Sequence, residues 1–350
     1  MYSFIVYFVQ QTTFQMYKSI HFLDEIEADY LQSVNEFVRE WESQSTTMEV
    51  FTSGSTGRPK SFLLNKIDME KSARATGKFF GFKEGQSLLL NLSPNYIAGK
   101  LMIVRALVHQ MNIVVAPLSA NPLLALKSYS DKIHFAAFVP SQVKAILQDE
   151  ISRKIYSTLE KVIIGGAAVN SDLEAKICQH HKATYATFGM TETITHFALR
   201  QLGGPVKLYQ CLEGTTVGVD AESRLIVHSP LVDEALQTND VIELVDDTSF
   251  VWKGRADYVI NSGGVKVHPE EVESEIRDLI PNQRFYISAA NDDQFGEVVA
   301  LVLEGEEFDE GAFFEALKLK KLKKYHAPRR LILVREFEET PTGKIIRKKF

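Results

Sequence analysis

The chain has 350 residues, a formal net charge of -6, 45% hydrophobic residues and 24% charged residues. This composition is that of an ordinary globular protein, and its acidic balance offers no general attraction to nucleic acid or to an anionic membrane surface. The length exceeds what one hydrophobic core usually supports, so we expect two units of unequal size. Cys178 and Cys211 form no CxxC pair, which excludes a disulfide framework or zinc site of the usual spacing and favours a reducing, cytoplasmic setting.

Residues 1–9 are apolar but too short to span a bilayer, and no cation precedes them as in a secretory signal. We interpret them as a strand or a loosely attached start and expect no membrane insertion. Between residues 22 and 41 the apolar residues recur at helical spacing, which predicts an amphipathic helix. A second helix is predicted from residue 66 to about residue 80.

The middle of the chain predicts a largely parallel α/β sheet, because apolar runs alternate with helical patterns. The runs cover residues 48–51, 87–91, 111–116, 135–139 and 161–164. After about residue 205 the pattern changes to shorter segments that predict antiparallel strands, at 224–228, 241–245 and 250–252.

The last part of the chain predicts a compact α+β unit that starts near residue 257. Its predicted order is a strand, a turn at 262–264, a helix at 269–279, strands at 285–289 and 297–303, a helix at 308–320 and a strand at 330–334.

Residues 52–60 read Thr-Ser-Gly-Ser-Thr-Gly-Arg-Pro-Lys. Hydroxyl groups and the exposed N–H groups of a glycine-rich turn are good donors to phosphate oxygens, so the segment is a candidate phosphate loop. It is not a Walker A loop, because Pro59 stands where the second glycine of that motif is needed. Composition alone would fit a surface loop equally well.

Four further segments follow in the order expected of one superfamily, and together with residues 52–60 they resemble acyl-CoA synthetases, adenylation domains and luciferases, which form acyl adenylates. The resemblance covers the chain from about residue 48 to its end. It implies an α/β fold with a large ATP- and acid-binding domain at 1–255 and a small mobile α+β lid at 256–350. Most members are longer before the phosphate loop, so the chain looks like a shortened member.

Residues 185–193, Tyr-Ala-Thr-Phe-Gly-Met-Thr-Glu-Thr, resemble the superfamily segment in which an aromatic ring stacks on adenine, a threonine contacts phosphate and a glutamate places Mg²⁺. These roles would fall to Phe188, Thr191 and Glu192. From the residues alone, Phe188 could be core and Glu192 solvated. The resemblance also implies nucleotide contacts by the phosphate loop and by the glycine turns after two strands, at Thr52, Ser53, Gly54, Ser55, Thr56, Gly57, Lys60, Gly165, Gly166, Ala167 and Gly189.

Residues 237–240 resemble the segment whose aspartate holds the ribose hydroxyls, which implies that role for Asp240. Residues 253–272 resemble the hinge and the start of the lid. There Arg255 would reach the nucleotide, Asp257 would be the pivot and Gly264 would leave room for the pantetheine arm of CoA. Residues 341–344 resemble the segment with the catalytic lysine, which would be Lys344. By position alone, Lys344 is a solvated cation of a basic tail.

Among shortened members, the chain resembles the o-succinylbenzoate–CoA ligases of menaquinone biosynthesis. An acid with two carboxylates needs a positive or hydrogen-bonding group away from the reacting end. The candidates are Lys100, Arg105, Thr195, His196 and Arg200, with His196 and Lys100 ranked first, and Tyr96 takes the place of a family histidine. A single histidine could equally be structural.

The resemblance implies that the acid reacts with Mg-ATP, with Lys344 and Thr191 stabilising the transition state, and that CoA then displaces AMP after the lid rotates. ATP, Mg²⁺, CoA and a small aromatic or aliphatic carboxylic acid are the implied ligands, and a homodimer is a family-level expectation. Three alternatives stay open: a CoA ligase for another aryl or fatty acid, an adenylation enzyme that loads a carrier protein, and a nucleotide-binding regulator without catalysis.

Overall fold

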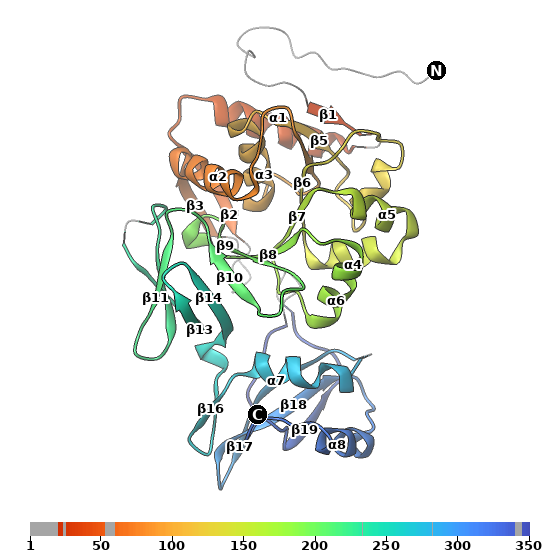
Figure 1. Cartoon of the computed structure of the whole chain (residues 1–350), viewed down its shortest axis with the longest axis vertical. Coiled ribbons are helices and arrows are strands. Elements are labelled where there is room, and N and C mark those ends of the chain that lie inside the picture. The colour runs from red at the N-terminus through yellow and green to blue at the C-terminus, as the bar shows by residue number, and fades with distance from the viewer. Residues whose placement is uncertain (1–19, 24–25, 53–59, 233, 282, 340–344) are drawn as a thin grey trace.

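The structure is a computed structural model that describes residues 20–23, 26–52, 60–232, 234–281, 283–339 and 345–350. Side chains are described for these residues except at 51, 52, 60–62 and 191. The apolar start at 1–9 lies outside the described residues. Figure 1 shows a larger unit above a smaller one, with helix α7 on the side of the smaller unit that faces the larger. No helix in the described ranges is long and apolar enough to span a bilayer.

Half of the large sheet consists of parallel strands in the order β1-β5-β4-β6-β7-β8. The strands are β1 (Ile20–Phe22), β4 (Ser87–Leu90), β5 (Asn112–Val115), β6 (Phe135–Phe138), β7 (Lys161–Ile164) and β8 (Thr184–Gly189). Strands β4 and β6 are buried at every position, as expected for parallel strands with both faces covered. The four apolar runs predicted as strands between residues 87 and 164 are confirmed.

The same sheet continues with antiparallel strands in the order β8-β9-β10-β14-β13-β12-β11. They are β9 (His196–Gln201), β10 (Leu208–Cys211), β11 (Thr216–Val219), β12 (Arg224–His228), β13 (Leu236–Asp246) and β14 (Ser249–Arg255). The predicted change to antiparallel strands is confirmed. It begins earlier than predicted, at β9, because the connection of residues 190–195 is too short for a parallel crossover.

Helices cover both faces of the parallel half. One face carries α1 (Ala28–Glu42), α2 (Lys66–Phe80) and α3 (Ile97–Val108), and the other carries α4 (Pro140–Gln148), α5 (Glu150–Thr158) and α6 (Ser171–His180). Helix α3 is buried at every position from Gly99 to Leu107. The helix predicted near residue 22 begins at Ala28, since Ile20–Phe22 pair with β5 as an edge strand.

The smaller unit has its own sheet and core. Its sheet has the order β16-β15-β18-β17 with β19 on β18, and α7 and α8 complete the unit. The elements are β15 (Ile260–Ser262), β16 (Val265–Val267), α7 (Pro269–Ile276), β17 (Phe285–Asp292), β18 (Gly296–Glu304), α8 (Glu310–Lys318) and β19 (Arg330–Val334). The predicted α+β order is confirmed, because strong apolar periodicity marks each element. The predicted domain boundary between residues 255 and 256 falls where β14 ends.

The joint between the two units is polar. Helix α7 packs against β14. Lys253 Nζ lies 2.8 Å from Glu243 of the larger unit and 3.5 Å from Glu271 of the smaller one. The hydroxyl oxygens of Ser171 and Ser274 lie 3.4 Å apart. Such contacts resemble those of separable protein interfaces more than those of a domain core.

Candidate active site

The predicted phosphate loop is flanked by a two-stranded hairpin of β2 (Thr47–Thr52) and β3 (Lys60–Asn65). The backbones of Thr52 and Lys60 pair with each other at the end of this ladder. The predicted contacts of the loop itself lie outside the described residues, and these are Ser53, Gly54, Ser55, Thr56 and Gly57. The strand β3 was not predicted, because its sequence is less apolar than that of a buried strand.

The predicted glycine turns lie after the carboxyl ends of neighbouring parallel strands, where open α/β sheets bind ligands. Gly165, Gly166 and Ala167 follow β7, and Gly166 and Ala167 are exposed. A Cβ on Gly165 would lie 2.6 Å from the hydroxyl oxygen of Thr187, so the absence of a side chain lets β7 and β8 approach. A Cβ on Gly189 would overlap the backbone at Thr195 and His196.

Phe188 is half-buried, and its ring packs edge to face against Phe197 and Phe250, at centroid distances of 5.6 and 5.2 Å. This packing fixes the ring at the carboxyl end of β8. The side chain of Glu192 is exposed in the short 3-10 helix η2 (Thr191–Thr193), whereas the side chain of Thr191 lies outside the described part of the structure.

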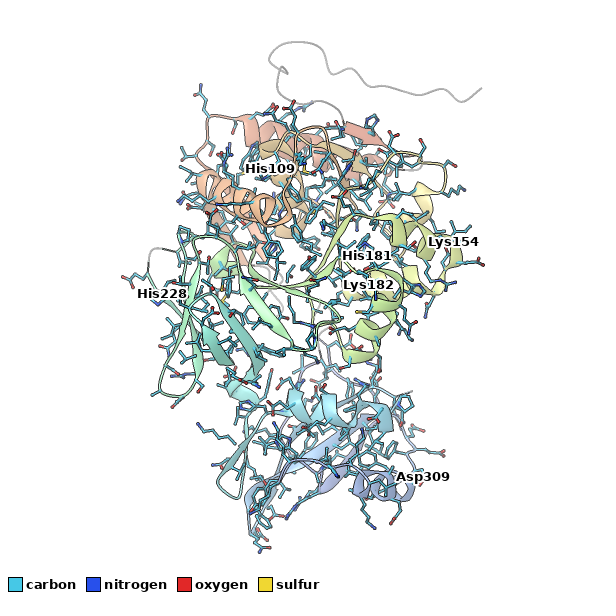
Figure 2. The ribbon with its side chains drawn as sticks, viewed as in Figure 1. His109, Lys154, His181, Lys182, His228 and Asp309 are labelled. Atoms are coloured by element: carbon cyan, nitrogen blue, oxygen red, sulfur yellow. The ribbon has the colours of Figure 1, made fainter. Side chains whose placement is uncertain are left out.

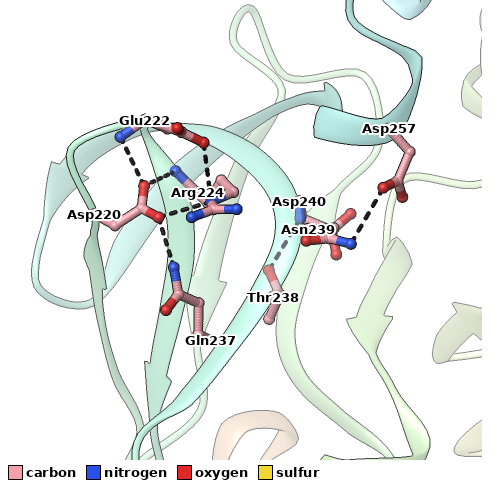
Figure 3. A network of polar contacts seen from close by, with 8 residues as sticks. All are labelled: Asp220, Glu222, Arg224, Gln237, Thr238, Asn239, Asp240 and Asp257. Atoms are coloured by element: carbon pink, nitrogen blue, oxygen red, sulfur yellow. Dashed lines mark hydrogen bonds and ion pairs between the residues drawn. The ribbon is translucent and has the colours of Figure 1, made fainter.

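Asp240 and its neighbours form a polar network at the start of the β13–β14 ladder (Figure 3). The backbone N–H of Asp240 donates to Thr238 Oγ1 over 3.0 Å, and the amide of Asn239 donates to Asp257 over 3.2 Å. Arg255 pairs with the carboxylate of Asp257 at 2.7 Å. The predicted ribose, nucleotide and hinge residues therefore lie together, and the predicted hinge residue is tied to both strands.

Sequence reasoning missed the indole of Trp252, which donates to Asp240 Oδ1 over 2.8 Å. It also missed Glu270, whose carboxyl lies against the backbone of β14. A Cβ on Gly254 would overlap Glu270 Oε2, so the glycine leaves the space that this carboxyl occupies. Burial raises the pKa of Glu270 to about 7, although the nearby Arg347 opposes the shift.

Of two other predicted residues of the lid, the structure describes one, Gly264. Gly264 lies in the turn between β15 and β16 with φ of 81°, and no atom of the described residues lies within 4 Å of the position of a Cβ there. The predicted role of Gly264 in the CoA step requires free space beside it. That space is open in the direction in which a Cβ would point. Lys344 lies outside the described residues. The residues that flank its segment, Glu339 and Ile345, form an antiparallel bridge.

The residues ranked first for the acid pocket face different helices. Lys100 is buried with its Nζ 4.9 Å from the ring centre of Phe37 on α1. His196 is buried against α2, with Nε2 hydrogen-bonded to Thr76 Oγ1 over 3.2 Å. Tyr96 is 60% exposed at the start of α3. Thr195 Oγ1 lies 3.5 Å from His196 Nδ1.

Arg105 is the most isolated of the five candidates. It is 2% exposed, and among the described residues its Nε and Nη2 atoms have no hydrogen-bond partner, while Nη1 lies 3.8 Å from the sulfur of Met102. Burial lowers the pKa of Arg105 to about 9. Burial and the charge of Arg105 together hold the pKa of His196 well below its ordinary value, so the imidazole is neutral. His109 lies one turn after Arg105 and is labelled in Figure 2. Burial lowers its pKa, and the charge of Arg105 adds to this shift.

Arg200, by contrast, is matched inside the protein. Its guanidinium makes two hydrogen bonds to the carboxylate of Glu174, at 2.7 and 2.9 Å. His181, also labelled in Figure 2, is likewise satisfied, since its two ring nitrogens bond to Thr184 Oγ1 and to the carbonyl oxygen of Leu159. The described residues therefore already pair the charge of Arg200 and both ring nitrogens of His181.

The described site therefore brings an aromatic ring, an aspartate, an arginine and an exposed glutamate to the carboxyl ends of β7 and β8 and the adjoining β13–β14 ladder. A sequence profile described as "AMP-binding enzyme" matches residues 9–225. The chain belongs to the AMP-binding enzyme family. It is an enzyme of the AMP-forming acid–CoA ligase kind within the adenylate-forming superfamily, as the order of its motifs predicted.

A similar solved structure is an acyl-CoA synthetase (AMP-forming)/AMP-acid ligase II-like protein from Dyadobacter fermentans. It is 31% identical, with a TM-score of 0.64, over 91% of this chain and 93% of that one. The 2-succinylbenzoate–CoA ligase of Listeria monocytogenes is 24% identical over 94% of this chain and 74% of its own length. The o-succinylbenzoate–CoA synthetase of Bacillus subtilis, solved with ATP and a magnesium ion, shares the fold, with a TM-score of 0.71 and 19% identity over 85% of this chain and 68% of that one.

Proposed function

We propose that this AMP-binding family enzyme activates o-succinylbenzoate as its acyl adenylate and transfers the acyl group to CoA. The observation that carries the choice of acid is the buried guanidinium of Arg105, for which the described part of the chain supplies no carboxylate. The names of relatives at 24% identity point to the same acid.

The position of Arg105 fits a role in reading a second carboxylate. Its charge acts on His196, the first residue of β9, and β9 follows directly after the segment with Thr191 and Glu192. An unpaired buried charge is costly, and a carboxylate that forms a forked pair with guanidinium removes much of that cost. A monocarboxylic acid uses its single carboxylate in the reaction and has none left for this arginine.

The nucleotide would be held by residues on or directly after β7, β8, β13 and β14. In this proposal the ring of Phe188 stacks on adenine, Asp240 accepts from the ribose hydroxyls, and Arg255 leaves Asp257 to reach the phosphates. The glycine turn at Gly165, Gly166 and Ala167 and the phosphate loop complete the contacts.

Among the described residues, no cluster of three or more His, Cys, Asp or Glu side chains could hold a metal ion by itself. Mg²⁺ at nucleotide sites usually takes one or two carboxylates together with phosphate oxygens, so the exposed carboxylate of Glu192 fits as its protein ligand. The ion would offset charge on the phosphates during attack. Thr191 and Lys344 would stabilise the same transition state, and rotation about Asp257 would then bring the turn at Gly264 to the site for the CoA step.

A pyrophosphate-release screen tests the proposal. The acids are o-succinylbenzoate, 4-oxo-4-phenylbutanoate (the same molecule without its ring carboxylate), benzoate, fatty acids and amino acids, each with and without CoA. We expect o-succinylbenzoate to give the highest kcat/KM and to be favoured over its monoacid counterpart by about 100-fold through pairing with a buried charge. In Arg105→Met this preference should disappear. Equal use of the two acids by the wild type would overturn the choice of substrate.

The Lys344→Ala variant separates the two half-reactions. It should lose pyrophosphate release by at least about 100-fold, a typical effect of removing one transition-state charge. It should still convert supplied acyl adenylate and CoA into thioester. Equal loss of both steps would contradict the assigned role of this lysine. If no acid releases pyrophosphate, adenylation itself is refuted and a nucleotide-binding regulator becomes the better description.

A further inference from the structure

The strand pair β13–β14 contains a bulge beside Asp240. Asp240 pairs with Arg255 and Val241 with Gly254, but Ile242 pairs with Trp252, so Lys253 is an extra residue on β14. Without the bulge, Ile242 would face Lys253 and the side chain of Trp252 would lie on the opposite face of the sheet. Because one extra residue reverses the alternation, the bulge places Trp252 on the same face as Asp240.

Gly254 belongs to the same irregular segment. Its φ of 142° lies in a region that L side chains rarely adopt, so the bulge needs this glycine. The result is a hydrogen bond of 2.8 Å from the indole N–H of Trp252 to Asp240 Oδ1. The bond joins a neutral donor to an ionised acceptor, which makes it stronger than a bond between neutral groups.

We propose that Trp252 is a positioning residue for ribose recognition, fixing the carboxylate of Asp240 in the orientation that accepts hydrogen bonds from the ribose hydroxyls. This inference rests on the proposed function, since it takes Asp240 as the ribose contact. The backbone N–H of Asp240 is held by its bond to Thr238, and the indole of Trp252 restrains the side chain. A carboxylate that is oriented before the ligand arrives loses less entropy on binding.

Packing alone does not explain a tryptophan at position 252. The side chain is half-buried at the edge of the cluster that contains Phe197 and Phe250. A phenylalanine would fill most of the same apolar space but could not donate to Asp240. The difference between the two side chains is therefore a direct test of the N–H group.

The test compares Trp252→Phe with Trp41→Phe, which makes the same change at the other tryptophan of the chain. Trp41 is half-buried on α1 and stacks on Phe37, at a centroid distance of 6.4 Å. Calorimetry measures binding of ATP, 2′-deoxy-ATP and 3′-deoxy-ATP in the absence of any acid. The readout is therefore independent of which acid the enzyme uses.

We expect Trp252→Phe to weaken ATP binding by up to about tenfold, because the variant must order the Asp240 side chain when ATP binds. The deoxy analogues should be affected less, so that the variant discriminates between riboses more weakly than the wild type. In the ATP–pyrophosphate exchange assay the KM for ATP should rise by a similar factor, while kcat changes by less than about threefold, as expected for lost ground-state binding. Trp41→Phe should leave all these ratios unchanged.

A purely structural role for Trp252 predicts a different pattern, in which all three nucleotides weaken equally, and that result would overturn the inference. If Trp252→Phe fails to fold, replacement of Trp252 by 3-benzothienylalanine, which has the same shape with sulfur in place of N–H, provides the same comparison. If the wild type binds ATP without discriminating between riboses, the role of Asp240 in the proposed function fails. If the wild type discriminates and the variant does so equally well, only the role of Trp252 fails.

Discussion

Arg200 on β9 and Arg105 on α3 are both buried, at 5% and 2% exposure, but they differ in what surrounds them. Arg200 has a forked pair with Glu174, and the backbone N–H of Gly203 donates to the same carboxylate over 3.0 Å. Although burial opposes it, these bonds lower the pKa of Glu174. Two nitrogen atoms of Arg105 have no hydrogen-bond partner in the described part of the chain.

The charge of Arg200 is paired within the fold, whereas in the proposed function the charge of Arg105 is paired by the substrate. A buried pair that is complete within the chain contributes little net stability but is costly to break. A buried cation without its anion lowers stability, and a chain that retains one gains if a ligand supplies the missing charge. The same measurement, stability after substitution, should therefore give opposite signs at the two sites.

Glu174→Ala should give the largest effect. Removing the carboxylate leaves Arg200 buried and uncompensated, which typically costs about 3–5 kcal/mol. Urea denaturation measures the loss. The matched control is Glu150→Ala, which breaks the exposed pair with Lys154 and should cost far less. A loss below about 1 kcal/mol for Glu174→Ala would remove the contrast between the two arginines.

Arg347 gives a third case, in which carboxylates outnumber the cation. It lies 2.7 Å from Glu273 and 3.7 Å from Glu270 at the joint between the units. Because the native state raises the pKa of Glu270 from 4.5 to about 7, the native state retains this proton between those values and the unfolded chain does not. Stability therefore falls as pH rises from about 4.5 to 7.

The Glu270→Gln variant should be more stable than the wild type by up to about 3 kcal/mol at pH 8 and by less than about 1 kcal/mol at pH 5. Urea midpoints at the two pH values measure the difference. Glu271→Gln is the control, and its effect on stability should have the opposite sign. Although burial opposes the shift, Lys323 and Lys253 lower the pKa of Glu271. If the stability gain of Glu270→Gln were the same at both pH values, the Glu270 carboxyl of the native wild type would be ionised at both.

Arg105→Met should stabilise the protein by about 1–2 kcal/mol or leave it unchanged, because the variant removes an unpaired charge and keeps an apolar chain of similar length. Arg200→Met is the matched control and should destabilise, since it leaves Glu174 without its partner. Thermal or urea unfolding gives both values. If Arg105→Met destabilised as much as Arg200→Met, Arg105 would have a structural partner and the comparison would fail.

The smallest effect concerns His196. Its native pKa is depressed, so as pH falls below about 6.5 the unfolded chain takes up a proton that the native imidazole refuses, and stability falls. Arg105→Met removes one of the two causes, so the pKa of His196 should rise towards its ordinary value and the loss at acid pH should shrink. NMR titration of the histidine signals measures this. An unchanged His196 pKa would show that the two side chains do not interact.

The sequence predicted elements best where apolar periodicity was strong. Helix α2 and strand β19 begin and end at the predicted residues. Asp240, Arg255 and Asp257, which the motifs assigned to one site, lie close together at the start of the β13–β14 ladder, and their roles stay predictions. Strands such as β1 and β3 were missed, because their pairing with β5 and β2 decides their structure more than their own short sequences do.

The finer features of the site depend on contacts between distant segments. Lys100 and His196 looked equivalent in the sequence, yet one contacts α1 and the other α2. The isolation of Arg105 is a property of its surroundings, which no local pattern records. The bond from Trp252 to Asp240 depends on a bulge whose only local sign was Gly254.

The ion pairs of Lys253 with Glu243 and Glu271 make the joint between the two units sensitive to the salt concentration. Ion pairs near the surface weaken as dissolved salt screens them, whereas the buried apolar contacts within each unit do not. Ionic strength can therefore change how the two units sit together without loosening either one. If the smaller unit rotates as proposed, a rise in ionic strength would change the rate of that rotation while leaving the fold of each unit intact.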